Sequence, residues 1–174
     1  SLTEKVAAAI PEELLDWRAE SRDGEHQFSL AEIVMHMIDA RRMFAAQLTG
    51  EDYTSMYFAP DYWSGGDVSD EIFYGFKPHG GTAALLENLT EARELFAPFL
   101  ALPGSELGHI TVGARSAFEQ MVAAFKADGH DTAAMERHGP PTVTHGLMSV
   151  IAHESGHRGA LGTLLRLNGV ALPE

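Results

Sequence analysis

Apolar residues recur every three or four positions in several long stretches of this chain, the spacing of one helix face. The clearest stretch is 29–49. Ser29 is a good N-cap there, Glu32 three residues later completes a capping box, and Gly50 ends the predicted helix. Its predicted core face comprises Leu30, Ile33, Val34, Met37, Ile38, Phe44, Ala45 and Leu48.

The same spacing predicts further helices, at residues 2–18, 82–101, 114–128 and 143–168. Pro11 removes a backbone donor, so the first of these should be broken near it. Thr82 is the expected cap of the second, and Pro98 should kink its last turn. Thr142 or Thr144 should cap the last helix.

Two regions carry no helical pattern. Residues 50–80 combine glycines and prolines with a dense supply of aromatic side chains, which predicts a long, ordered loop. That loop is a candidate lid over a pocket, or alternatively a cap over the open end of the core. Residues 129–141 are predicted to be a loop closed by Pro140 and Pro141. Because strand patterns are absent or weak, the expected fold is all-α, an up-and-down helical bundle forming one domain over 1–174.

Composition excludes several function classes. The formal charge is −13, and no Lys/Arg-rich stretch offsets it, so we expect no nucleic-acid partner. No stretch approaches about 20 apolar residues, so we expect no membrane span. The start lacks the basic and apolar segments of a signal peptide. The chain has no cysteine, which excludes disulfides, thiolate ligands and a cysteine nucleophile, and agrees with a cytoplasmic protein.

Three of the nine histidines lie well inside predicted helices. His153 and His157 are four residues apart, so both project from one helix face, which they share with apolar residues. Two neutral imidazoles one turn apart form half of a zinc or nickel site. His36, beside the apolar stripe of another helix, is a candidate third ligand. The alternatives are hydrogen-bonded core histidines for the pair and a boundary residue for His36.

The string HESGH also matches the HExxH pattern of zinc proteases, with Glu154 as the general base. Those enzymes need a third ligand after the motif. The extended pattern requires Gly and His where this chain has Ala160 and Thr163, and the glutamate version finds only the terminal Glu174. We therefore expect no protease, while Glu154 remains a candidate catalytic residue or an ordinary carboxylate on a helix face.

Three charged neighbours complete the candidate site. Glu32 and Asp39 lie one turn on either side of His36, where a carboxylate could orient a ligand imidazole, although most such carboxylates are simply solvated. Arg158 follows His157 in the sequence. It is a candidate cofactor-binding residue, clamping an anion at the pocket, or alternatively one half of a salt bridge between helices.

Three segments together resemble the DinB-like superfamily, also called YfiT-like metal-dependent hydrolases. They are IPEELLDWR at 10–18, SLAEIVMHMIDARRMF at 29–44 and HESGHRGALGTLLRLNGV at 153–170. Their order and spacing match both ends of the family pattern, whereas residues 50–140 carry no matching motif. The chain departs from the frequent HRGQ by having Ala160, and it carries an added helix at 114–128.

The resemblance implies a four-helix bundle in which His36, His153 and His157 bind one divalent metal ion and leave positions open. Zinc or nickel is expected, and iron also suits histidine nitrogen. Characterised members include metal-dependent transferases that join low-molecular-weight thiols to electrophiles, and thiol-dependent isomerases. The resemblance therefore implies a small-molecule substrate and an external thiol, and a homodimer by analogy.

Such a site suits catalysis, because three neutral ligands leave the ion its full charge. A metal-bound thiol would give transfer, and a metal-bound water would give hydrolysis. The expected function is thus that of a metal-dependent thiol S-transferase or hydrolase. Two alternatives stay open: a non-catalytic metal-containing binding or stress-response module, and a metal that only staples the helices together.

Overall fold

The computed structural model describes residues 1–20, 27–53, 55–57 and 78–173. Throughout these ranges the regular elements are helical and no strand occurs, which confirms the all-α prediction. The elements are α1 (Leu2–Ala8), the short 3-10 helix η1 (Glu12–Leu14), α2 (Leu30–Thr49), α4 (Gly81–Glu94), α5 (Ala97–Leu100), α6 (Val112–Ala127), α7 (Ala133–His138) and α8 (Val143–Leu167). Within this part of the chain, no helix is both long and apolar enough to cross a membrane.

Helix α2 begins and ends where the sequence predicts. The Ser29 side chain accepts a hydrogen bond from the Glu32 amide, and the Glu32 side chain accepts one from the Ser29 amide, which completes the capping box. At the other end Gly50 has a φ of +76°, a left-handed conformation that glycine adopts without steric penalty. Local sequence therefore determines both ends of this helix.

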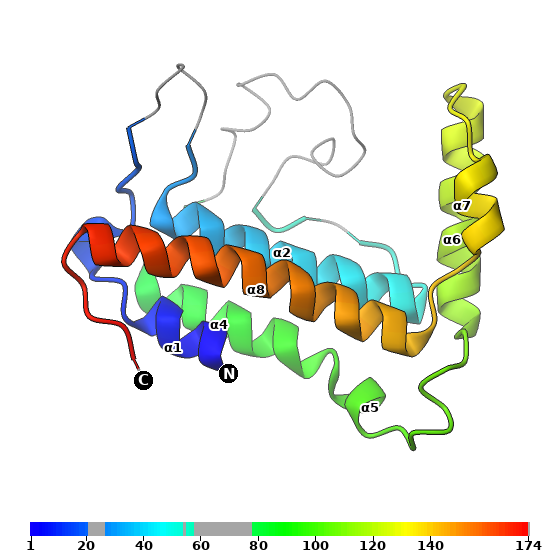
Figure 1. Cartoon of the computed structure of the whole chain (residues 1–174), viewed down its shortest axis with the longest axis horizontal. Coiled ribbons are helices and arrows are strands. Elements are labelled where there is room, and N and C mark those ends of the chain that lie inside the picture. Colours follow the sequence, from blue (N-terminus) through cyan, green and yellow to red (C-terminus); the bar gives the residue numbers. More distant parts are fainter. Residues whose placement is uncertain (21–26, 54, 58–77, 174) are drawn as a thin grey trace.

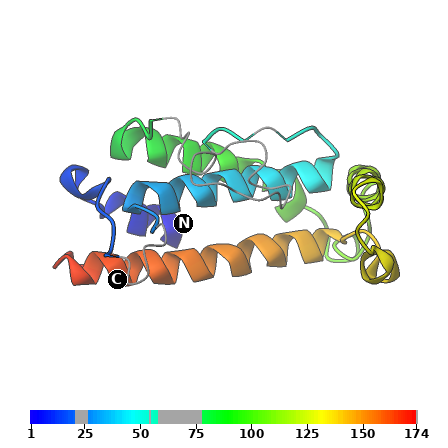
Figure 2. The same ribbon diagram turned by 90° about the horizontal axis from the view of Figure 1, so that it is seen from above.

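The long helices pack in a ring (Figure 1). Helix α2 contacts α8 and α4, and α1 contacts the same two helices from the other side. Helices α2 and α4 run in one direction, whereas α1 and α8 run in the opposite one. Helix α6 contacts α2. Figure 2 shows α6 and α7 end-on, so these two helices lie across one end of the long ones.

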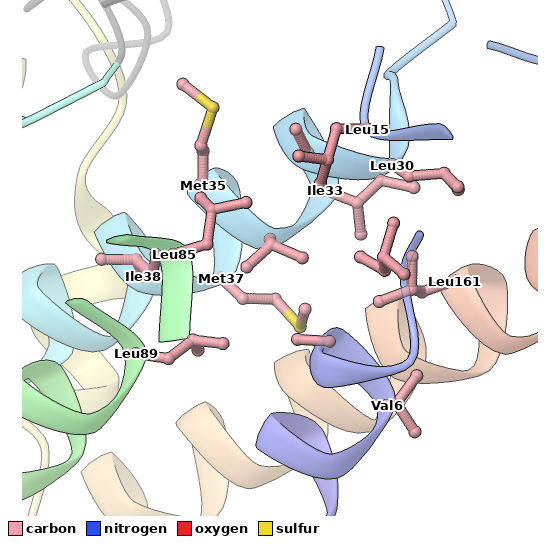
Figure 3. Close-up of a cluster of buried hydrophobic side chains, with 14 of the residues drawn as sticks. Val6, Leu15, Leu30, Ile33, Met35, Met37, Ile38, Leu85, Leu89 and Leu161 are labelled. Atoms are coloured by element: carbon pink, nitrogen blue, oxygen red, sulfur yellow. The ribbon is translucent and has the colours of Figure 1, made fainter. Parts of the chain in front are cut away.

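Helix α2 supplies the centre of the core. Every residue from Leu30 to Arg41 is buried, and their apolar side chains meet those of α1, α4 and α8, including Val6, Leu89 and Leu161 (Figure 3). The predicted stripe was narrower than this, because a helix with neighbours on several sides buries more than one face.

Several boundaries differ from the prediction. Residues 82–101 form two helices, α4 and α5, with Pro98 in the first turn of α5, where its missing N–H costs no hydrogen bond. Thr82 is not a cap. The N-cap is Gly80, and the Thr82 amide donates instead to Glu12 Oε1 at 2.9 Å. The predicted loop at 129–141 contains α7, so that prediction was wrong over Ala133–His138.

Other predictions hold. Pro11 separates α1 from η1, and Thr142 rather than Thr144 caps α8 by accepting from the His145 amide. The predicted helix at 114–128 starts slightly earlier, as α6, with Thr111 as its N-cap. The proposed lid at 50–80 falls mostly on residues 58–77, which lie outside the described residues.

Helix α6 is attached to the end of α2 by backbone contact. A Cβ added at Gly113 would overlap the carbonyl of Thr49, and the Thr111 hydroxyl donates to the Leu48 carbonyl. Only glycine permits this close approach.

We therefore expect Gly113→Ala to lower the free energy of unfolding by about 1–3 kcal/mol, since the added methyl forces α6 away from α2. Gly159→Ala is the matched control. It lies inside α8 with open space around the added atom, so it should raise the free energy of unfolding by about 0.5–1 kcal/mol. Urea unfolding of both variants measures the difference. Equal stability of Gly113→Ala and the parent chain would contradict the close approach.

Candidate metal centre

The three predicted histidines meet between the two longest helices. His36 lies in the N-terminal half of α2, and His153 and His157 lie one turn apart on the facing side of α8. The Nε2 atoms of His36 and His153 are 3.0 Å apart, and one ring nitrogen of each histidine lies within 4.8 Å of the other two. The ring centroids are 4.5–4.9 Å apart. The structure thus brings together all three candidate ligands.

These separations suit a shared ion. Two nitrogens bound tetrahedrally to zinc at about 2.0–2.1 Å would be about 3.3 Å apart. The 3.0 Å between the Nε2 atoms of His36 and His153 is slightly shorter than this distance, and the 4.8 Å limit for the three ligand nitrogens is longer. Small rotations of the rings would therefore place the three nitrogens around one ion. His36 is buried, whereas His153 and His157 are half-buried. The histidine group is therefore buried on the α2 side and partly exposed on the α8 side.

Burial keeps the three rings neutral. It lowers the pKa of His36 from 6.5 to about 3, and repulsion from protonated His157 and His153 adds to this. Burial is also the main cause that lowers the pKa of His153 and of His157. Neutral imidazole is the form that binds metals, because protonation removes the free lone pair.

One nitrogen of the group lacks a protein partner. His153 Nδ1 is buried and makes no hydrogen bond within the described residues. A buried polar atom without a partner costs about 1–3 kcal/mol.

Two aromatic rings flank the group. Phe28 stacks on His36 with centroids 5.9 Å apart, and Phe44 packs edge-on against His153 at 6.1 Å. The apolar flanks strengthen electrostatic interactions inside the site.

The carboxylates beside His36 have other partners. Glu32 pairs with Arg18 through two contacts, the longer of which is 2.7 Å from Nη2 to Oε1, in addition to its capping bond. Asp39 is fully buried and accepts hydrogen bonds from the Ser55 hydroxyl and from the amides of Met56 and Tyr57. Both carboxylates are thus buried structural groups and are not solvated, and their contacts attach loops to α2.

Glu154 faces away from the histidines, toward a buried arginine. Its carboxylate accepts from Arg41 Nε, from Arg41 Nη2 at 3.0 Å and from the Thr3 hydroxyl at 2.9 Å. Arg41 also donates to the Leu89 carbonyl. These contacts favour a structural role for Glu154, joining α1, α2 and α8, and its proposed catalytic role remains a prediction.

Arg158 lies on the same side as Glu154. It donates to the hydroxyls of Thr3 at 3.3 Å and Ser155 at 3.4 Å. It also lines a cavity of about 330 Å³ between α1 and the C-terminal half of α8. This cavity contains none of the three histidines among its lining residues. Arg158 thus contacts Thr3 on α1 and Ser155 on its own helix, and its role as an anion clamp at the metal stays a prediction.

Sequence reasoning missed Arg41 and the two flanking aromatics. Arg41 is 3% exposed. Its position within the apolar stretch of α2 could have indicated a buried cation that needs a partner. Phe28 and Phe44 each lie eight residues from His36, about two helical turns, which places Phe44 on the His36 face of α2. That spacing was visible in the sequence.

Comparisons of the chain with protein-family models, curated proteins and solved structures find no match.

The depressed histidine pKa predicts a pH dependence for the metal-free protein. The unfolded chain protonates His36 near its ordinary pKa of 6.5, whereas the folded chain does so only near about 3. Between these values the unfolded state binds more protons, so stability is full above 6.5 and falls as the pH drops. The His36 contribution should approach 1.4 kcal/mol per pH unit, as an order-of-magnitude limit.

Urea unfolding at about pH 7 and about pH 5 measures this loss. His36→Gln should lose less stability over the same interval, because it lacks the titrating ring while the other groups remain. An identical pH slope in the parent chain and in His36→Gln would show that His36 does not carry the effect.

The Glu154 contacts predict that Glu154→Gln lowers the free energy of unfolding by about 3 kcal/mol, because it leaves the buried Arg41 guanidinium with only the longer ion pair to Glu4, at 3.8 Å. The zinc affinity of the variant should change less than about threefold, which is below the 10–100-fold effect typical of a residue that supports a ligand. Urea unfolding and zinc titration measure the two quantities. A large loss of zinc affinity at unchanged stability would assign Glu154 to the metal centre instead.

Proposed function

We propose that this chain is a metal-dependent enzyme of the DinB-like superfamily, in which His36, His153 and His157 hold one divalent ion. The observation that carries the proposal is the meeting of three neutral histidines from two helices, with one ring nitrogen of each within 4.8 Å of the others. The fold supports it as well. The ring of contacts among α1, α2, α4 and α8 fits a four-helix bundle, in which α2 and α4 run parallel to each other and antiparallel to α1 and α8, so the directions do not alternate along the chain as in an up-and-down bundle.

The proposed reaction is transfer or hydrolysis on a small molecule. A bound zinc or nickel ion, or iron, would lower the pKa of a thiol or a water and supply a nucleophile at neutral pH. The protein contributes three ligands and no thiol of its own, since the chain has no cysteine. A low-molecular-weight thiol would therefore come from outside. The half-buried His153 and His157 mark the side from which substrate would approach.

A structural staple is the competing role, because the same three ligands would cross-link α2 to α8. The size of the hydrophobic core argues against the need for a structural metal ion. Among the described residues, seventeen buried apolar ones from α1, α2, α4, α8 and the adjoining segments already form one cluster. A non-catalytic binding module remains the second alternative, and turnover is what separates it from an enzyme.

We expect the purified protein to contain about one equivalent of divalent metal by elemental analysis. His36→Ala, His153→Ala and His157→Ala should each weaken zinc binding by more than about 100-fold, because loss of a ligand exceeds the 10–100-fold effect of a supporting residue. His145→Ala is the matched control. It removes an exposed histidine from the same helix α8 and should leave zinc binding unchanged.

The absence of stoichiometric metal from the parent protein would overturn the proposal. Turnover is then tested with low-molecular-weight thiols and an electrophile such as 1-chloro-2,4-dinitrobenzene. Metal-dependent turnover that is lost in His153→Ala, at a melting temperature close to that of the parent, excludes the staple. Metal binding without turnover of any thiol or hydrolysable ester favours the binding module.

A further inference from the structure

A second feature lies beside the histidines. A pocket of about 590 Å³ opens between the C-terminal half of α2, helices α6 and α7, and the first turns of α8. Small-molecule sites usually measure about 300–1,000 Å³, so the pocket is large enough for a ligand or for a substantial part of one. Its walls include Phe44, Phe118, Met121 and Ser149.

The pocket adjoins the histidine group through Phe44. This ring lines the pocket and also packs edge-on against His153, with centroids 6.1 Å apart. On α8, Ser149 and Gly146 line the pocket and lie one and two turns before His153, on the same helix face. The pocket wall thus lies about one helical turn, roughly 6 Å, from the histidines.

The lining differs in chemistry from the rest of the chain. Charged residues make up 21% of the sequence and the net charge is −13, yet none of the described residues that line this pocket is Asp, Glu, Lys or Arg. Its described side chains are phenylalanines, methionines, prolines, small or uncharged polar groups and the two histidines His138 and His145. A charged group of a ligand would meet no carboxylate, lysine or arginine among them, whereas apolar groups would bury surface at a favourable free energy. Methionine side chains adapt to varied apolar shapes.

We propose that this pocket binds the uncharged aliphatic or aromatic part of a small molecule whose polar, reacting end lies at His36, His153 and His157. The assignment of the reacting end rests on the function proposed above. The pocket itself specifies the remainder of the substrate, namely an apolar tail that passes Phe44. The substrate class is therefore amphipathic, with one metal-directed group and one apolar group.

The test uses n-alkyl hydroxamates, whose head group binds zinc and whose chain length varies. Octanohydroxamate should bind the zinc-loaded protein at least about tenfold more tightly than acetohydroxamate, because each fully buried methylene raises affinity up to about fourfold. Ser149→Phe should abolish this advantage by filling the part of the pocket wall that lies one helical turn before His153 on α8. The matched control is Met148→Phe, which changes a neighbouring side chain that is 58% exposed and does not line the pocket.

Met121→Glu provides a second variant at a partly exposed lining position, so the test does not depend on the folding of Ser149→Phe alone. The carboxylate should weaken octanohydroxamate binding at least about tenfold and leave acetohydroxamate binding unchanged. Equal affinities for the two hydroxamates in the parent protein would overturn the inference. So would a chain-length advantage that survives both lining variants.

Octan-1-ol separates this inference from the metal proposal, because it needs no metal. In the metal-free protein it should shift the amide resonances of Phe44, Gly146 and Ser149, and Ser149→Phe should remove the shifts. If zinc does not bind but these shifts occur, the proposed function fails and the apolar pocket is supported. If zinc binds but octan-1-ol leaves these amides unshifted, the pocket inference fails and the metal centre stands.

Discussion

The burial of α2 is the constraint on which the rest of the structure depends. From Leu30 to Arg41 every residue of this helix is buried, and four of them are polar. Buried polar groups without partners are costly, so each of the four requires a partner from another part of the chain. The resulting pairs are Glu32 with Arg18, Asp39 with the amides of Met56 and Tyr57, Arg41 with Glu154, and His36 with His153. These pairs determine which segments lie against α2 and in what register.

The pair between Arg41 and Glu154 has a direct consequence for the histidines. Glu154 is the residue next to His153, so its contact with Arg41 sets the rotation and height of α8 against α2. With α8 held in this way, His153 and His157 face His36 on the other side of the helix. The glutamate of the HExxH-like string thus joins α8 to α2 through Arg41, on the side of α8 that faces away from the histidines.

The histidine contact is unlike the other three. Arg18 and Arg41 meet carboxylates, and Asp39 meets backbone and hydroxyl donors, so those groups have electrostatic complements. His36 instead meets two further neutral imidazoles, and His153 Nδ1 is buried without a partner. The Nε2 atoms of His36 and His153 are in contact at 3.0 Å, and one ring nitrogen of each histidine lies within 4.8 Å of the other two. The group could therefore hold a divalent cation, because neutral imidazole nitrogens are metal ligands.

The sequence by itself determined the helical class, the ends of α2 and α8, and the pairing of His153 with His157, because caps and helical spacing act within a few residues. It also supplied His36 as a third candidate, through position and family resemblance. It did not reveal that α7 lies within a predicted loop or that Glu12 accepts a hydrogen bond from the first turn of α4, because those depend on contacts with distant segments. Nor did it show which charged neighbours serve the histidines. Only the tertiary structure decided that Glu154 faces Arg41, that Asp39 holds a loop, and that Phe44 lines a pocket beside the histidines. Burial and side-chain pairing arise only when the helices pack together. The sequence pattern predicts which residues share a face of a helix, but it does not identify the segments that this face contacts.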